Sequence, residues 1–295
     1  MGPLNRRELI ALAGASALAP LAPARSGIVV CMHQATSTPF DFRAAMEGYS
    51  RAGIRAVEVM LTKVREFADK NSVGAARRLL DDLGLRPVST SNQLGLVEPN
   101  PARANNLEEL RWKCELAQAL GCDRIVTPTL TRETFTEEDY KRGVDNLREA
   151  GEVARPYKVT VMVEFTRLST FAGTLSTALQ LVRNANHPNV RAMMDTYHFW
   201  GGVSKFEDLE LLRDGELHHL HFEDIPANPP REQLEQRHRA FPGQGIAPLR
   251  RILDVLKRKK YAGPASVEMF DPAIQAGDPY AVALKARAAV EALLG

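Results

Sequence analysis

The sequence predicts an α/β protein built as a single (β/α)8 TIM barrel, and three observations lead to this fold class. Eight short apolar runs of the β type alternate with eight longer stretches of helical periodicity. Successive runs begin roughly 25 to 50 residues apart, as strand–helix units require. Units of this kind form a parallel sheet, and eight parallel strands close into a barrel. No internal linker interrupts the pattern, so we expect one domain over residues 27–295.

The expected strands are continuous apolar runs, which is how a strand buried on both faces reads. Several are rich in Val, Ile and Thr, which favour an extended backbone. In chain order, we expect the eight strands at Ile28–Met32, Ile54–Met60, Arg86–Thr90, Arg124–Thr127, Val159–Glu164, Val190–Asp195, Leu217–Phe222 and Ala265–Met269.

The expected helices lie between these strands, and their ends carry recognisable signals. Gly53, Gly84 and Gly121 each follow a helical stretch and precede a strand, where a left-handed backbone is common. Thr136 and the acidic residues up to Asp139 are typical of a helix N-terminus. We expect the eight helices at Asp41–Ala52, Val64–Leu83, Ala102–Leu120, Thr136–Tyr157, Leu175–Ala185, Lys205–Arg213, Pro248–Lys260 and Tyr280–Leu294.

An open, doubly wound sheet is the alternative arrangement of the same strand and helix order. Sheets of that kind that bind nucleotides carry a glycine-rich loop directly after a strand. Neither the G-x-G-x-x-G nor the G-x-x-x-x-G-K-[ST] pattern follows any of the expected strands. The barrel therefore remains the predicted fold.

The first 24 residues differ from the rest, and we expect them to be a Tat-type signal peptide. Arg6 and Arg7 precede an apolar run at 9–22, and Ala22-Pro23-Ala24 fits a cleavage site. The run is too short and too rich in small residues for a membrane span. We expect a periplasmic protein that is not membrane-bound after cleavage. A segment that does not work as a signal would leave the protein in the cytoplasm.

Four of the expected strands stop on a side chain of a type that binds metal ions. These side chains are Glu164 in VMVEF, Asp195 in AMMDTYH, His221 in HLHFED and Glu268 in ASVEMF. A charge at the end of a buried strand is costly unless it is paired or bound to a metal. Because the C-terminal ends of barrel strands point into one mouth, we expect the four side chains to converge there.

Three carboxylates and one imidazole favour one divalent cation, with Mn²⁺ ahead of Mg²⁺, Co²⁺ and Zn²⁺. Such a cation binds a ketone oxygen and an adjacent hydroxyl, acidifies the neighbouring C–H and stabilises an enediolate. Glu164 and Glu268, on opposite sides of the metal, could then move the proton as general acid and base. The set predicts an isomerase or epimerase that acts on a keto-polyol or keto-sugar, although the spacing does not distinguish these reactions.

Further polar residues are expected near the mouth. His198 and Arg239 are candidates for binding substrate oxygens. Glu58 interrupts the apolar run AVEVM, where a substrate contact and a buried ion pair are equally good interpretations. His219 shares its strand face with His221 because side chains alternate, so it is the rival ligand in that strand.

At these residues the chain resembles the xylose-isomerase-like barrel family of sugar isomerases and epimerases, and it looks most similar to the inosose isomerase branch. The likeness extends over nearly all of 27–295 and is strongest in VMVEF, MMDTYHFW, HFED with RAFPGQG, and SVEMF. It implies a homodimer or homotetramer. For the site, the resemblance implies that one metal ion is bound by Glu164, Asp195, His221 and Glu268. It also implies that the two glutamates exchange the proton. His198 and Arg239 would bind the substrate, and Glu58 would lie near it.

Two departures from that branch bear on the substrate. Strand one ends in His33 and Gln34, where the inosose isomerases carry Asn and Glu, and the export signal is unexpected for an enzyme of inositol breakdown. Elimination from a 3-keto-glycoside is therefore an alternative, because it begins with the same proton abstraction beside a ketone.

Two other functional classes fit parts of the sequence. Endonuclease IV shares the fold and the Asp195-x-x-His198 pattern, but it uses more metals and histidines, and strand three here ends in Ser91-Asn92-Gln93. The formal net charge of +2 also opposes nucleic-acid binding. A non-catalytic sugar-binding protein is the remaining alternative, and the intact Glu164 and Glu268 argue against it.

Overall fold

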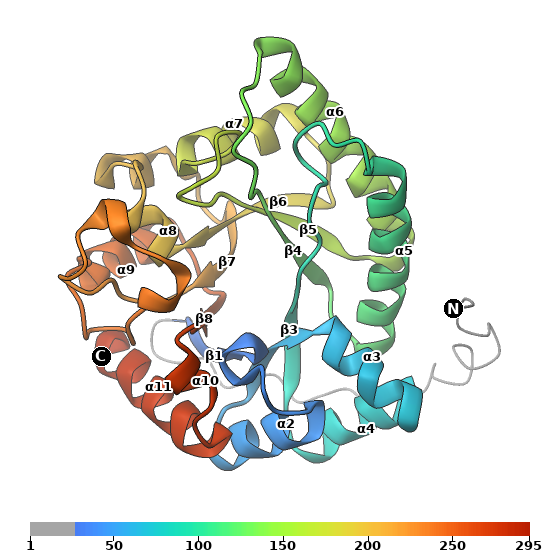
Figure 1. Cartoon of the computed structure of the whole chain (residues 1–295), viewed down its shortest axis with the longest axis vertical. Helices are drawn as coiled ribbons and strands as arrows, with labels where there is room; N and C mark the ends of the chain where they lie inside the picture. The colour runs from blue at the N-terminus through green and yellow to red at the C-terminus, as the bar shows by residue number, and fades with distance from the viewer. Residues whose placement is uncertain (1–26) are drawn as a thin grey trace.

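The computed structural model describes residues 27–295, which form one closed barrel. Eight parallel strands follow one another around the ring in sequence order, and β8 returns to pair with β1. Figure 1 looks onto this ring and shows the helices arranged around its outside. The predicted (β/α)8 barrel is therefore confirmed.

The strands overlap the runs predicted for them. Their bounds are β1 Val29–His33, β2 Ala56–Met60, β3 Arg86–Ser91, β4 Arg124–Pro128, β5 Thr160–Glu164, β6 Val190–Asp195, β7 Leu217–His221 and β8 Pro264–Val267. The register pairs Asp195 with His221 across β6 and β7. Two of the expected metal-binding side chains therefore end their strands side by side.

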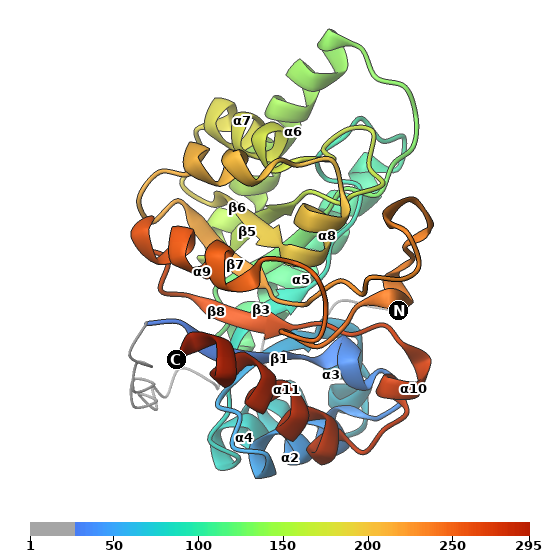
Figure 2. The same ribbon diagram turned by 90° about the vertical axis from the view of Figure 1, so that its left-hand side faces the viewer.

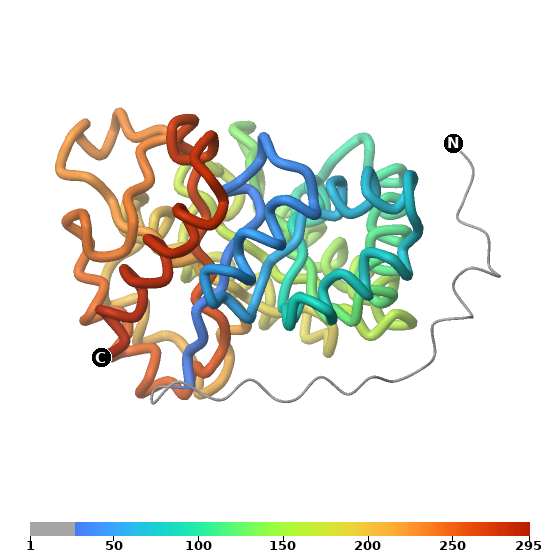
Figure 3. Tube along the Cα trace, turned by 90° about the horizontal axis from the view of Figure 1, so that it is seen from below, coloured from blue at the N-terminus to red at the C-terminus, as the bar shows by residue number. Residues whose placement is uncertain are grey.

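The helices form the outer layer. Their bounds are α2 Phe42–Arg51, α3 Leu61–Lys70, α4 Val73–Asp82, α5 Arg103–Leu120, α6 Glu137–Ala154, α7 Leu175–Ala185, α8 Thr196–Gly201, α9 Leu249–Arg258, α10 Pro272–Gln275 and α11 Pro279–Leu294. The last helix, α11, packs against α2 and closes the ring, as Figure 3 shows. Gly48 permits this close approach, because a Cβ at this position would lie 2.6 Å from the Cβ of Pro279.

The single helix predicted over 64–83 is wrong, because the structure has two helices there. α3 ends at Lys70, and the backbone of Asn71 leaves the helical region with φ −130° and ψ −79°. Ser72 then begins α4, and its Oγ accepts a hydrogen bond from the N–H of Ala75 at 3.0 Å. Serine is a favoured N-cap, so the pair Asn71-Ser72 ends one helix and starts the next.

The α-helix predicted over 205–213 is also wrong, since this segment forms the 3₁₀ helix η3, Phe206–Leu211. The sequence did not predict α8, which follows β6 directly. Asp195 caps α8, and its Oδ1 accepts the N–H of His198 at 2.9 Å. This cap holds His198 next to the end of β6.

The long loop between β7 and α9 folds back onto the strand ends. Asp224 and Ala240 pair in an antiparallel bridge, and the carboxylate of Asp224 accepts the N–H groups of Gly243 at 3.0 Å and Ala247 at 2.9 Å. The loop contains the 3₁₀ helices η4 (Arg231–Gln233) and η5 (Gln236–His238). In Figure 2 this orange segment lies on the side toward which the strand arrows point. The bridge returns Arg239 to the end of β7.

Among residues 27–295, no helix is long and apolar enough to cross a membrane. The expected signal peptide, residues 1–24, lies outside the described residues.

The helix start predicted at Thr136 gives a stability test. Thr136 and Asp139 form a capping box, in which Oγ1 of Thr136 accepts the N–H of Asp139 at 3.3 Å and Oδ2 of Asp139 accepts the N–H of Thr136 at 2.8 Å. We expect Thr136→Ala to lower the free energy of unfolding by about 1 kcal/mol in urea denaturation. Thr134→Ala, in the exposed loop before α6, is the matched control. Equal losses in both variants would contradict the capping role.

Candidate metal centre

The four strand-end residues predicted from the sequence come together at one end of the barrel. Glu164, Asp195 and His221 are the last residues of β5, β6 and β7, and Glu268 follows the last residue of β8. All four are buried, with exposed fractions between 0% and 7%. The barrel therefore places three carboxylates and one imidazole in a space that is largely closed to water.

His221 lies at the centre of this group. Its Nδ1 is 3.1 Å from Oε1 of Glu164 and 3.4 Å from Oε2 of Glu268. The same nitrogen is 3.8 Å from Oδ2 of Asp195. Adjacent ligand atoms around an octahedral ion are about 3 Å apart when each bond is about 2.1 Å long. Ligand atoms of Glu164, Asp195 and His221 all lie within 4.8 Å of one another, so these three residues could hold one divalent cation, with Glu268 beside them.

Arg239 inserts its guanidinium between these carboxylates. Its Nη1 lies 2.8 Å from Oδ2 of Asp195 and 3.2 Å from Oε2 of Glu268. It also lies 3.1 Å from Oε2 of Glu223. Because its side chain is 1% exposed, the ion pairs are shielded from solvent. Arg239 therefore neutralises part of the negative charge of the site.

The acid groups of the site differ in how readily they ionise. Burial raises the pKa of Glu268 to about 7, although His221 and Arg239 act in the opposite direction. Burial and the neighbouring Asp195 hold the pKa of Glu223 well above its usual range. Burial opposes ionisation of Asp195 as well, but Arg239 and His198 keep its pKa well below the usual range. The guanidinium of Arg239 thus favours the ionised form of Asp195, whereas burial favours the protonated form of Glu268 in the metal-free site.

Glu223, to which the sequence alone assigned no role, also lies in the site. Its Oε1 accepts the backbone N–H of Glu268 at 2.7 Å and so ties the end of β7 to the end of β8. The sequence did contain a signal for this position. Glu223 lies two residues after His221, and the alternation of side chains along an extended chain puts both on the same face. Its partner is 45 residues away, so the hydrogen bond itself could not be read from the sequence.

His198 lies beside Asp195 and Arg239, as the sequence led us to expect. Its Nδ1 accepts the backbone N–H of Arg167 at 3.2 Å, so the neutral ring carries its proton on Nε2. This Nε2 lies 3.5 Å from Nη2 of Arg239 and 3.5 Å from Nε2 of Gln236. Burial lowers the pKa of His198, although Asp195 acts in the opposite direction.

Glu58 points into the barrel but is completely buried below the four residues. Its Oε2 is 2.8 Å from Nε2 of His219 and 3.1 Å from Nε2 of His221. Of the two roles left open for Glu58, this geometry favours the buried structural contact, here with two histidines, over the expected substrate contact. His219, the rival ligand, shares the face of His221 as predicted, but it contacts Glu58 from below.

His33 and Gln34 follow the same barrel edge at the end of β1. Nε2 of His33 lies 3.3 Å from Oε1 of Glu268 and 3.4 Å from Oε1 of Glu58, and burial lowers the pKa of His33 to about 3. The side chain of Gln34 accepts the N–H of Met60 at 3.0 Å. His33 thus reaches the site as a neutral ring, whereas the oxygen of Gln34 joins β1 to β2.

A cavity of about 1140 Å³ is lined by the loop after β7 and by residues that follow β5 and β8. Leu168, Leu234 and Phe270 contribute apolar surface to it, and Gln236 lines it from the loop. Gln236 also accepts a hydrogen bond from Nη2 of Arg239 at 2.9 Å, which connects this cavity to the buried charges. None of the four strand-end residues is among the described residues that line this cavity.

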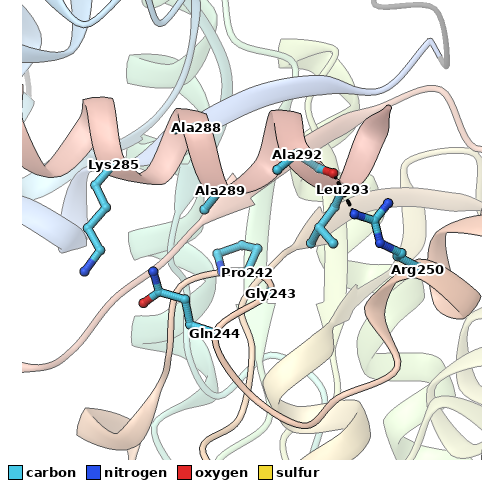
Figure 4. Close-up of a pocket in the computed structure, with 9 residues that line it drawn as sticks. All are labelled: Pro242, Gly243, Gln244, Arg250, Lys285, Ala288, Ala289, Ala292 and Leu293. Atoms are coloured by element: carbon cyan, nitrogen blue, oxygen red, sulfur yellow. Dashed lines mark hydrogen bonds between the residues drawn. The ribbon is translucent and has the colours of Figure 1, made fainter.

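Figure 4 shows a different pocket, of about 330 Å³, between the loop at Pro242 and α11. Lys285 and Ala289 lie on its helix side, and Arg250 donates a hydrogen bond to the carbonyl of Ala292 at 2.9 Å. None of the described residues that line it carries a carboxylate or an imidazole. Its charged groups are the cations Arg250 and Lys285, which do not bind a divalent metal, so the strand ends remain the candidate site.

The family match and the sequence relatives of this chain both point to barrel enzymes of the same kind. A family described as xylose isomerase-like TIM barrel matches residues 47–293. Inosose isomerase of Halalkalibacterium halodurans is 26% identical over 249 residues, which cover 82% of this chain and 88% of the relative. 3-Dehydroshikimate dehydratase of Pseudomonas putida is 26% identical over 244 residues, which cover 78% of this chain but 36% of that protein.

Solved structures show the same fold. A crystal structure of IOLI protein with a binding zinc atom superposes with a TM-score of 0.84 at 23% identity, over 90% of this chain and 98% of that one. D-Psicose 3-epimerase superposes with a TM-score of 0.73 at 18% identity, over 91% of this chain and 100% of that one.

The buried position of Arg239 leads to a stability prediction. We expect Arg239→Gln to lower the free energy of unfolding of the metal-free protein by about 3 kcal/mol, because Asp195 and Glu268 lose their buried cation. Urea denaturation with a chelator present measures this loss. Arg237→Gln is the matched control, since Arg237 forms an exposed ion pair with Glu235 at 3.1 Å and should contribute less than about 1 kcal/mol. Similar losses in the two variants would contradict the assigned role of Arg239.

Proposed function

The chain belongs to the xylose isomerase-like TIM barrel family, and on that premise we propose that it is a divalent-metal-dependent isomerase or epimerase of a keto-polyol or keto-sugar. One observation carries the proposal: the carboxylates of Glu164, Asp195 and Glu268 surround Nδ1 of His221 at the barrel mouth. The inosose isomerase relatives and the epimerase fold neighbours support this class of substrate.

Glu164, Asp195, His221 and Glu268 are the residues we propose as ligands of one divalent cation. Their oxygen and nitrogen donors suit Mn²⁺ and also Mg²⁺, Co²⁺ or Zn²⁺. When bound, such a cation polarises a substrate ketone and acidifies the adjacent C–H bond.

Glu164 and Glu268 are the residues we propose for moving the proton. They are 5% and 7% exposed, whereas Asp195 is 0% exposed, so the two glutamates reach furthest toward a substrate. Glu268 is the proposed base because its carboxylate lies just past the end of β8 at the barrel mouth, beside the other proposed ligands and within 3.4 Å of Nδ1 of His221. Removal of that proton gives an enediolate, and its return at a different position or face gives the isomer or epimer.

His198 and Arg239 are proposed to bind the oxygens of the substrate. Both lie beside Asp195, and Arg239 presents a guanidinium that suits an oxygen carrying negative charge. The loop that carries Arg239 returns to the end of β7 through the bridge between Asp224 and Ala240, which places Arg239 beside Asp195.

Elimination is the second candidate reaction, because 26% identity to 3-dehydroshikimate dehydratase of Pseudomonas putida extends over 244 residues. A lyase would use the same first step, in which a glutamate removes a proton beside a ketone, and would then expel an oxygen substituent. A 3-keto-glycoside is the substrate that we propose for this alternative. A product that has lost water or an alcohol would distinguish it from an isomerase.

We further propose Tat-dependent export, a periplasmic location and assembly as a homodimer or homotetramer. The twin arginines Arg6 and Arg7 support the first two. Cell fractionation with an Arg6→Lys, Arg7→Lys variant tests export, and light scattering on the purified protein tests assembly.

Metal removal gives the first functional prediction. We expect the purified protein to contain about one divalent ion per chain and to lose activity when a chelator removes it, because the proposed chemistry depends on a polarised ketone. Elemental analysis measures the ion, and added Mn²⁺ should restore the activity. Protein that is active without a stoichiometric ion would contradict the proposal.

The proton-carrying role gives the second functional prediction. We expect Glu268→Gln to reduce deuterium exchange from D₂O into the substrate by about 10²- to 10⁴-fold, because an amide does not act as a general base. NMR follows the exchange for inososes, ketohexoses and 3-keto-glycosides with saturating Mn²⁺.

Elemental analysis of the same Glu268→Gln sample separates loss of the base from loss of the metal. Exchange that persists in this variant would remove Glu268 from the reaction. Wild-type protein that binds a sugar but shows no exchange with any candidate would identify a sugar-binding protein instead.

A further inference from the structure

Glu58 is the acceptor at the centre of a buried hydrogen-bond network below the proposed metal ligands. Its Oε2 accepts from Nε2 of His219 at 2.8 Å, from Oγ of Ser266 at 3.0 Å and faces Nε2 of His221 at 3.1 Å. Its Oε1 accepts from Oγ of Ser89 at 3.3 Å. An ionised carboxylate only accepts hydrogen bonds, so every group that faces it must present a proton.

The two nitrogens of His221 face different surroundings. Nδ1 is directed at the carboxylates of Glu164 and Glu268, at 3.1 and 3.4 Å, and Nε2 is directed at Glu58. A neutral imidazole has one N–H and one lone pair, and a metal ligand must offer the lone pair. If the N–H is on Nε2 and donates to Glu58, the lone pair of Nδ1 points toward the other ligands.

We infer that Glu58 is a positioning residue that holds His221 in the Nε2–H tautomer and thereby makes Nδ1 the nitrogen that binds metal. The inference rests on the proposed metal site and deepens it. A carboxylate that receives the second N–H of a metal-binding histidine fixes the ring orientation and increases its basicity as a ligand.

The surrounding residues support this assignment over substrate binding by Glu58. The side chain is 0% exposed, and His221 lies between it and the carboxylates of the mouth. His33 adds a further N–H: its Nδ1 accepts from the N–H of Ala35 at 2.9 Å, so the proton of the neutral ring is on Nε2, 3.4 Å from Oε1 of Glu58. Glu58 is thus surrounded by the imidazoles of His33, His219 and His221 inside the barrel, and its side chain has no contact with solvent.

Three variants separate the role of Glu58 from simple packing. Glu58→Met removes the acceptor at similar volume, and we expect the dissociation constant for Mn²⁺ to rise by about 10- to 100-fold. Glu58→Gln keeps one acceptor oxygen without the charge, so its affinity should lie between those of wild type and Glu58→Met. Ser89→Ala is the matched control: it removes a neighbouring hydrogen bond to Glu58, leaves the contact with His221, and should bind Mn²⁺ as the wild type does.

Titration calorimetry with Mn²⁺ measures the affinities, and circular dichroism shows whether each variant is folded. In Zn²⁺-loaded wild type, ¹⁵N NMR of the histidine side chains should show a proton on Nε2 of His221 and none on Nδ1. This second measurement needs no variant, so it tests the inference even when substitution of Glu58 prevents folding.

The outcomes are distinguishable. Wild-type protein that binds no divalent cation overturns the proposed function, and the inference with it. Wild type that binds Mn²⁺ while folded Glu58 variants bind equally well overturns the inference alone. A proton on Nδ1 of His221 in the Zn²⁺-loaded protein also overturns it, whereas the graded loss with Nε2 protonated supports it.

Discussion

Four carboxylates share one buried space at the mouth of the barrel, and the need to compensate their charge governs the structure around them. Two like charges about 4 Å apart repel by about 4 kcal/mol at an effective dielectric constant of about 20. Arg239 meets this need for Asp195 and Glu268, and it also contacts Glu223. The fold of the loop after β7 brings Arg239 to these carboxylates. The bridge between Asp224 and Ala240 returns the chain to the strand end, and Arg239 directly precedes Ala240.

The site is organised by depth. Glu164 and Glu268 lie nearest the surface, His221 lies beneath them, and Glu58 lies at the bottom with its imidazole partners. The lower groups have shifted pKa values with different causes. Burial lowers the pKa of His219. The histidines that face Glu58 keep its pKa well below the usual range, although burial acts in the opposite direction. Glu164 and Glu268, the two residues proposed to move the proton, belong to the upper layer.

The regular part of the barrel could be predicted from the sequence, and the departures have local causes. Every strand overlaps its apolar run, because burial on both faces selects the same residue types throughout. The break at Asn71-Ser72 was missed because helical periodicity continues across it, while a side-chain hydrogen bond to Ala75 ends one helix and starts another. α8 was missed because six residues are too few to display a helical period. Its start depends instead on the cap that Asp195 provides.

The sequence by itself determined the barrel and the convergence of Glu164, Asp195, His221 and Glu268, because charges that end buried strands of one parallel barrel must meet at its mouth. Only the tertiary structure decided which nitrogen of His221 faces those carboxylates, that Glu223 ties β7 to β8, and that Glu58 lies below the site. The reason is physical: Glu58 and His221 are 163 positions apart, and their 3.1 Å contact depends on which side chains cross the interior of the closed barrel. Alternation along a strand specifies the face of a residue, but not its partner across the barrel.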